Sequence, residues 1–160
     1  MLFAKIAQFG AIAAIVVHAA CSGVPSQPRT FSDELHDAAR AGDLREIRSL
    51  IGQGADVNAR DPDDGDTPLD AAVRNRQVEA AEQLLLHGAD PNRRTRGSTP
   101  LHLAAERGII ELARLLLDHG ANAELRDLEN LTPLAVAREK RHTRFVSFLL
   151  EEIQARRRVR

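Results

Sequence analysis

The chain contains the stretch Thr99-Pro100-Leu101-His102-Leu103-Ala104-Ala105, followed by Gly108, Leu115-Leu116-Leu117 and Gly120-Ala121-Asn122. These residues are the signals of a complete helical hairpin. Thr99 can cap a helix through its hydroxyl, and Pro100 suits the first helical position, where no amide donor is needed. Gly108 permits a turn into a second helix, and Gly120 supplies the left-handed residue that ends it. One such hairpin cannot bury its own apolar face, so further copies are expected.

The copies lie on both sides of this stretch. Thr67-Pro68-Leu69 precedes it, and Thr132-Pro133-Leu134 follows it at nearly the same spacing. Asp33-Glu34-Leu35-His36 stands in the same place one further period upstream of Thr67. A period of about 33 residues with the pattern T-P-L-H-x-A is typical of ankyrin repeats. The chain therefore resembles the ankyrin-repeat family over about residues 32–153.

This resemblance implies an all-α solenoid of stacked helix-turn-helix units joined by hairpin-like loops. The expected segments are a signal peptide at 1–20, a flexible tether at 21–31, four repeats at 32–61, 62–94, 95–126 and 127–153, and a basic tail at 154–160.

Three local departures from the repeat pattern lead to expectations of their own. In the first unit, Ser32 or Asp33 is expected to cap the helix in place of threonine. Arg76 occupies a turn position that is glycine in units one and three, so that turn is expected to be looser or locally different. Asn130 replaces the glycine before Thr132, which is a tolerable change because asparagine visits left-handed geometry.

The first twenty-one residues resemble a bacterial lipoprotein signal. A short basic start, Met1-Leu2-Phe3-Ala4-Lys5, precedes a mostly apolar run from Ile6 to Val17, and small residues follow it. The run is shorter than the roughly 20 residues that span a bilayer. Cys21 stands where such signals carry their lipid. Three alternatives remain open: a lipid on Cys21, ordinary cleavage near Ala20, or an uncleaved anchor. The expected location is periplasmic or secreted.

Composition argues against several functional classes. A formal charge of −1 does not favour a nucleic-acid partner, and a single cysteine forms no intramolecular disulfide or cysteine cluster. The acidic run from Asp61 to Asp66 is out of register for a calcium loop, because glycine falls at position five and Ala72 at position twelve. His36 and His102 are expected to bond backbone and hold loops. We therefore expect no enzyme, no cofactor and no metal.

In the ankyrin family, the loop tips and the exposed ends of each first helix usually contact the partner. Carried onto this sequence, the acidic first tip, the basic second tip and a third tip with two exposed leucines would form the binding surface. The candidate residues are Arg60, Asp63, Asp64, Asp66, Arg74, Asn75, Arg93, Arg94, Arg96, Ser98, Glu106, Arg107, Arg126, Leu128, Glu129, Leu131, Arg138 and Glu139.

The expected function is a monomeric, non-catalytic binding module of the bacterial envelope, which captures a protein on its concave face. Two alternatives are a membrane-tethered scaffold whose arginine-rich tail lies on lipid and an inhibitor of a partner enzyme.

Overall fold

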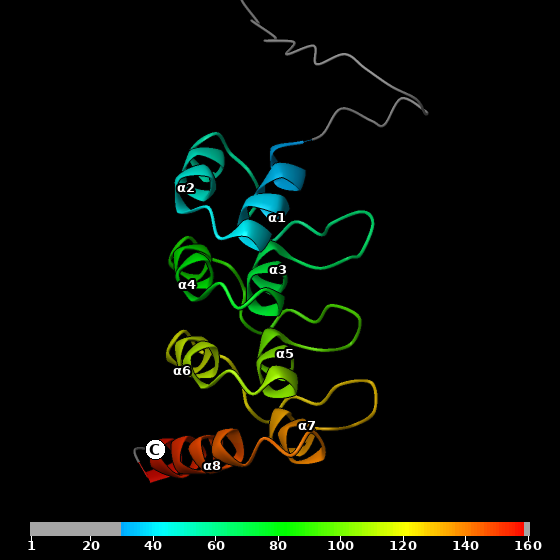
Figure 1. The fold of residues 1–160 in the computed structure, drawn as a ribbon, viewed down its shortest axis with the longest axis vertical. Helices are drawn as coiled ribbons and strands as arrows, with labels where there is room; N and C mark the ends of the chain where they lie inside the picture. The colour runs from blue at the N-terminus through cyan, green and yellow to red at the C-terminus, as the bar shows by residue number, and fades with distance from the viewer. Residues whose placement is uncertain (1–29, 159–160) are drawn as a thin grey trace, which may run out of the picture.

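The computed structural model describes residues 30–158, which form a column of four stacked helical hairpins (Figure 1). We call the hairpins repeats one to four. Within these residues there are eight helices and no strand. The pairs are α1 (Phe31–Ala41) with α2 (Leu44–Gly52), α3 (Pro68–Arg74) with α4 (Val78–Leu86), α5 (Pro100–Arg107) with α6 (Ile110–Asp118), and α7 (Pro133–Glu139) with α8 (Thr143–Arg158). The predicted all-α ankyrin-type solenoid is confirmed.

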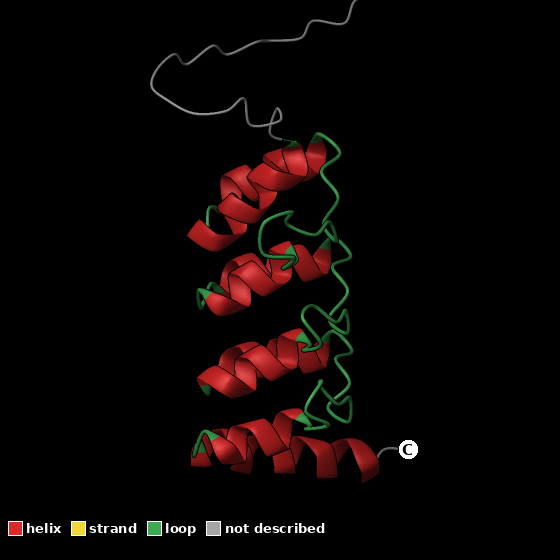
Figure 2. Cartoon of the chain, turned by 90° about the vertical axis from the view of Figure 1, so that its right-hand side faces the viewer, coloured by secondary structure: helices red, strands yellow, loops and turns green. Residues whose placement is uncertain are grey.

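The arrangement has two helical layers and one set of loops. The odd-numbered helices lie between the even-numbered helices and three protruding loops (Figure 1), and Figure 2 shows the same column from the loop side. We call these loops the first tip (61–66), the second tip (95–98) and the third tip (127–131). Each tip is closed by a 2.9 Å backbone hydrogen bond from its first amide to its last carbonyl.

The predicted signals occupy equivalent places in the column. Thr67, Thr99 and Thr132 each immediately precede the first helix of a hairpin, with proline at the first helical position. The leucine that follows is fully buried in repeats two and three. The core is therefore a continuous stripe of small and aliphatic side chains, which suits the close stacking of thin helices.

The start of α1 corrects one expectation. Its cap is Thr30, not Ser32 or Asp33, so the helix begins one residue earlier than the predicted repeat boundary. The Thr30 hydroxyl accepts a hydrogen bond from the Asp33 amide at 3.2 Å, and the Asp33 carboxylate accepts one from the Thr30 amide at 2.7 Å. Asp33 serves as the third residue of a capping box, so it is not itself the cap.

The turn at Arg76 corrects a second expectation. Arg76 has a φ of 61° and Arg141 a φ of 59°, as in the glycine turns of repeats one and three. These turns therefore keep the left-handed geometry of the glycine turns and are not locally different, and the left-handed conformation costs each arginine about 1–2 kcal/mol. Asn130 is left-handed as predicted, with a φ of 63°.

The end of α8 corrects the boundary expected at residue 153. The helix continues to Arg158, so most of the predicted tail belongs to the last repeat. The Arg156 guanidinium donates to the Leu117 carbonyl at 2.9 Å and to the Asp118 carboxylate at 3.0 Å. Because these groups end α6, the cation stabilises the C-terminus of the neighbouring helix.

A side-chain ladder links successive repeats, and the sequence analysis missed it. Asn58 donates to the Gly88 carbonyl at 3.0 Å and accepts from the Asp90 amide at 2.9 Å. Asn92 makes the same pair of bonds one repeat later, to Gly120 and Asn122. The sequence could have predicted this ladder, because an asparagine recurs two residues after each Gly-Ala-Asp element.

The expectations for the signal segment, most of the tether and Cys21 lie outside the described residues. Within residues 30–158, no helix is both long enough and apolar enough to cross a membrane.

Candidate partner-binding surface

His102 anchors the third tip to the start of α5. Its Nδ1 accepts from the Thr99 amide at 3.3 Å and from the Thr99 hydroxyl at 2.8 Å, so Nε2 carries the hydrogen and donates to the Leu131 carbonyl at 3.0 Å. Burial lowers the pKa of His102, which favours the neutral ring. His36 likewise contacts backbone carbonyls, including that of Asp66 at 3.0 Å. The expected loop-holding role of both histidines is confirmed.

Repeat two carries a buried aspartate, Asp70, at the position of these histidines. One oxygen of Asp70 accepts from the Thr67 amide at 3.0 Å and from the hydroxyls of Thr67 and Thr95 at 2.8 Å each. The second oxygen is buried without a hydrogen-bond partner. Burial raises the pKa of Asp70. The sequence analysis missed this residue, although the change from T-P-L-H to T-P-L-D was visible.

The charges of the first two tips pair with one another. Asp66 is buried, and its carboxylate lies 2.6 Å from Arg74 Nε and 3.9 Å from Arg96 Nε. Arg96 also donates to the Asp64 carbonyl at 2.6 Å, and Arg40 contacts the Asp64 carboxylate at 3.3 Å. Asp66 is therefore not the exposed contact residue that was expected, because it is buried beside Arg74 of its own repeat and near Arg96 of the next repeat.

The third tip presents one leucine to solvent, not two. Leu128 is 81% exposed and lies directly over Gly97 of the second tip. Leu131 is half-buried, packs against the core and donates its amide to the Asp127 carboxylate at 2.9 Å. Leu131 is therefore not a second exposed leucine, because its side chain packs against the core.

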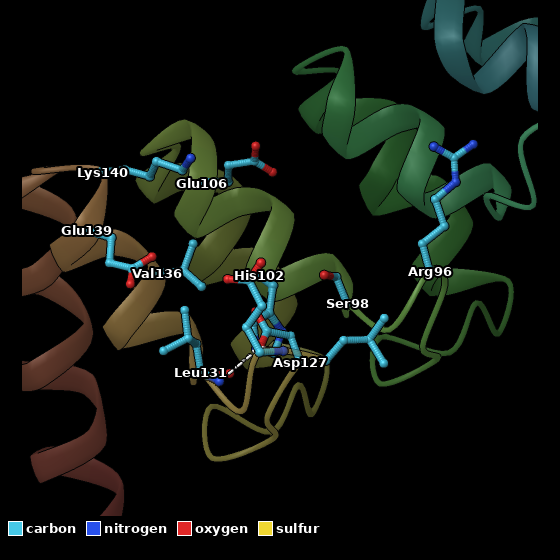
Figure 3. Close-up of a pocket in the computed structure, with 11 residues that line it drawn as sticks. Arg96, Ser98, His102, Glu106, Asp127, Leu131, Val136, Glu139 and Lys140 are labelled. Carbon is cyan, nitrogen blue, oxygen red and sulfur yellow. Dashed lines mark hydrogen bonds between the residues drawn. The ribbon is translucent and has the colours of Figure 1, made fainter.

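A hollow of about 280 Å³ lies between the second and third tips and the ends of α5 and α7 (Figure 3). His102 and Leu131 lie at its floor, and the figure shows Glu106, Glu139 and Lys140 on the helix ends above them. Its charged residues are Glu106, Asp127, Glu129, Glu139, Arg96 and Lys140. Carboxylates outnumber cations in this lining, and the neutral ring of His102 adds no positive charge. In the described part of the chain, no ion pair is formed by the three glutamates.

The hollow brings together some of the predicted contact residues and adds others. From the predicted set it contains Arg96, Ser98, Glu106, Leu128, Glu129, Leu131 and Glu139. The sequence analysis missed His102, Asp127, Val136 and Lys140 as lining residues. Asp127 could have been found, because an aspartate also opens the first tip.

The remaining predicted residues lie elsewhere. The Arg60 side chain donates a hydrogen bond to the Arg94 carbonyl at 2.8 Å. The Asn75 side chain donates one to the Ala71 carbonyl at 2.8 Å, within its own repeat. Arg126 donates to the Asn130 carbonyl at 2.8 Å. The predicted residues outside the hollow are Arg60, Asp63, Asp64, Asp66, Arg74, Asn75, Arg93, Arg94, Arg107, Arg126 and Arg138.

Comparison with known families identifies the repeats. Residues 35–85 match a family described as "Ankyrin repeats (many copies)", and residues 92–158 match one described as "Ankyrin repeats (3 copies)". Within residues 30–158, no group of three or more histidine, cysteine, aspartate or glutamate residues is placed to hold a metal ion.

Several curated proteins match part of this chain over a small part of their own length. Human ARF GTPase-activating protein GIT2 is 38% identical over 63 residues, which is 39% of this chain and 8% of the relative. Mouse 2-5A-dependent ribonuclease is 40% identical over 73 residues, which is 44% of this chain and 10% of the relative. Bovine mitochondrial disaggregase is 40% identical over 79 residues, which is 49% of this chain and 11% of the relative. The chain thus spans about a tenth of the length of these relatives.

Proposed function

Because this chain belongs to the ankyrin-repeat family, we propose that it is a monomeric, non-catalytic module that captures a protein partner on its concave face. Ankyrin repeats are protein–protein interaction modules, and stacked repeats use extended curved surfaces for binding. The concave face is the surface formed by the three tips and the exposed ends of α3, α5 and α7.

The observation that supports this proposal best is the hollow beside Leu128. A large apolar side chain that is 81% exposed at the rim of a hollow is a candidate anchor for a partner. The first tip is a weaker candidate, because Asp66 and Asp64 already pair with arginines of the same chain.

The chemistry of the hollow defines the partner segment. Leu128 provides the exposed apolar contact, Leu131 and Val136 line the hollow beside it, and the unpaired glutamates at positions 106, 129 and 139 provide negative charge. A segment that places a lysine or arginine beside an apolar side chain would satisfy both features. Complementary charge would also speed the encounter, and this effect would weaken as salt increases.

The test uses the purified chain as bait, followed by measurement of affinity for the captured protein. The Leu128→Ser and Glu129→Gln changes together should weaken binding by at least tenfold. Leu86→Ser is the matched control, because Leu86 is 62% exposed but lies on α4, away from the tips. Equal affinity of the double variant and the control would exclude the hollow as the binding site.

We also propose that the module acts in the bacterial envelope, secreted or held to a membrane by a lipid on Cys21. The composition of residues 1–21 supports export. Expression in a bacterium with and without Cys21→Ala tests the anchor. The parent chain should fractionate with membranes and the variant should be soluble. Cytoplasmic accumulation of the intact parent chain would contradict the proposed location.

The rival scaffold function depends on the arginine-rich end lying on lipid. Arg156 is engaged by Leu117, Asp118 and Glu152, so it is less available for lipid than a free tail would be. An inhibitory role would be a special case of partner capture, and the partner's own activity assay would reveal it.

A further inference from the structure

The lower face of repeat four has no cover among the described residues. We use this term for the side of α7 and α8 that points away from repeat three, at the bottom of the column in Figure 1. Leu69 and Leu101 are 1% and 0% exposed, whereas Leu134 at the same position of repeat four is only half-buried. Among the described residues no helical hairpin follows repeat four, whereas repeats two and three are each followed by one, and we attribute the burial of Leu69 and Leu101 to it.

The second helix of repeat four shows the same difference. Ala113 and Leu117 of α6 are 0% and 2% exposed. Their counterparts one repeat later, in α8, are Val146 and Leu150, and both are half-buried. Leu134, Val146 and Leu150 therefore form an apolar lower face, which is the kind of surface that the column normally buries under another helical hairpin.

The opposite end of the column is built differently. The positions that hold Pro100, Leu103 and Leu112 in repeat three hold Glu34, Asp37 and Glu46 in repeat one. A polar outer face on a terminal repeat keeps a solenoid soluble. It also opposes end-to-end stacking of two copies, because the carboxylates of one copy would be buried against the leucines of the other.

The lower face also carries positive charge at a position that internal repeats bury. Arg138 is exposed and occupies the position of Val73 and Ala105, both of which are 0% exposed. Arg141 and Arg144 lie at the same end of the hairpin. No ion pair involves these three arginines in the described part of the chain. A covering partner must therefore supply carboxylates as well as apolar side chains.

We propose that the lower face of repeat four is a second docking surface, separate from the concave face, for a helical hairpin of another protein. The occupant continues the column in the way that each repeat follows the one before it. Its upper surface is apolar opposite Leu134, Val146 and Leu150, and it places glutamate or aspartate opposite Arg138.

A defined probe tests this proposal with the full chain. The probe is a fluorescent synthetic hairpin with the sequence of residues 132–158, held helical by one lactam staple in each helix. It keeps Pro133, Val136 and Phe145, which occupy the upper face of a repeat. Its basic cluster is changed to glutamate at positions 138, 140, 141 and 144. A second hairpin with the unchanged basic cluster is the matched probe.

The acidic hairpin should bind the full chain saturably, and the basic hairpin should bind at least tenfold more weakly. The chain variant Leu134→Ser/Leu150→Ser should lose at least tenfold in affinity for the acidic hairpin. Arg138→Ala, at an exposed position that leaves the core intact, should remove much of the preference for the acidic hairpin. Leu86→Ser on α4 should bind normally.

Three results would overturn the proposal. The first is equal binding of the acidic hairpin to the parent chain and to both lower-face variants. The second is absence of saturable binding by the folded, stapled hairpin. The third is concentration-dependent self-association of the parent chain in sedimentation that Leu134→Ser/Leu150→Ser abolishes, because a second copy would then be the occupant.

Discussion

Gln77 packs so closely on Gly42 that a β-carbon at residue 42 would lie 2.5 Å from Gln77 Oε1. His142 covers Gly108 in the same way, with a ring atom 2.8 Å from the corresponding position. Glycine is therefore favoured at these two turns by left-handed geometry and by contact with the next repeat, and the contact is less adaptable at Gly108, where the neighbour is a rigid ring. Arg76 is exposed at the equivalent turn, and the next repeat has Ile109 at the position that Gln77 and His142 occupy.

Gly108→Ala should lower the free energy of unfolding by about 2–4 kcal/mol, from left-handed strain and overpacking against the His142 ring together. Urea denaturation followed by circular dichroism measures the loss. In a His142→Ala background the same change should cost only about 1–2 kcal/mol, the strain alone. An identical cost in both backgrounds would mean that His142 does not constrain the turn.

Arg76→Gly should raise the free energy of unfolding by about 0.5–1 kcal/mol, because relief of left-handed strain exceeds the added flexibility of the unfolded chain. The matched control is Arg48→Gly in the exposed interior of α2, which should cost about 1 kcal/mol. Destabilisation by both changes would indicate that the Arg76 side chain makes a compensating contact.

Asp70→Asn should change how stability depends on pH. Burial raises the folded-state pKa of Asp70 above 3.8. The contribution of Asp70 to the free energy of unfolding is therefore present below pH 3.8 and is lost as the pH rises through the folded-state pKa. The asparagine variant lacks this loss. Its stability relative to the parent chain should therefore increase from pH 3 to pH 7, as measured by urea denaturation at several pH values. If the difference in free energy of unfolding between the variant and the parent chain does not change with pH, the pKa of Asp70 is not raised in the folded state.

His102→Ala should change the pH dependence in the opposite direction. The folded-state pKa of His102 is lowered below 6.5, chiefly by burial. The contribution of His102 to the free energy of unfolding is therefore present above pH 6.5 and is lost as the pH falls through the folded-state pKa. The stability gap between the parent chain and the variant should be larger at pH 7.5 than at pH 5. Ring NMR signals provide an independent check, since Nε2 should carry the hydrogen at pH 7.5.

Asn92→Ala should destabilise the column by about 1–2 kcal/mol, because it removes two hydrogen bonds between repeats. Asn75→Ala is the control, since its side chain bonds within one repeat and should cost about 0.5 kcal/mol. Hydrogen exchange should show repeats three and four opening more readily in the Asn92 variant. Equal costs would argue against the ladder as a coupling element.

The hairpins could be predicted because their signals act over a few residues. The proline after Thr67, Thr99 and Thr132 starts a helix through bonds within the first turn, and the regular spacing of these starts identifies the stacked fold. The helix ends were less predictable. The cap of α1 is Thr30, which was not the expected residue, and α8 continues past residue 153, where Arg156 donates hydrogen bonds to the end of α6.

The sequence by itself determined four helical pairs, their order, and the loops that would protrude from them. Only the tertiary structure decided which polar and apolar groups of those loops remain available. Asp66 is neutralised by Arg74, and the Leu131 backbone is held by His102 and Asp127, whereas Leu128 stays exposed. The reason is that these contacts depend on the distances between side chains and backbone groups in the folded tips and between neighbouring repeats. The repeating pattern predicts which hairpins are adjacent, but it does not specify which side chains will meet.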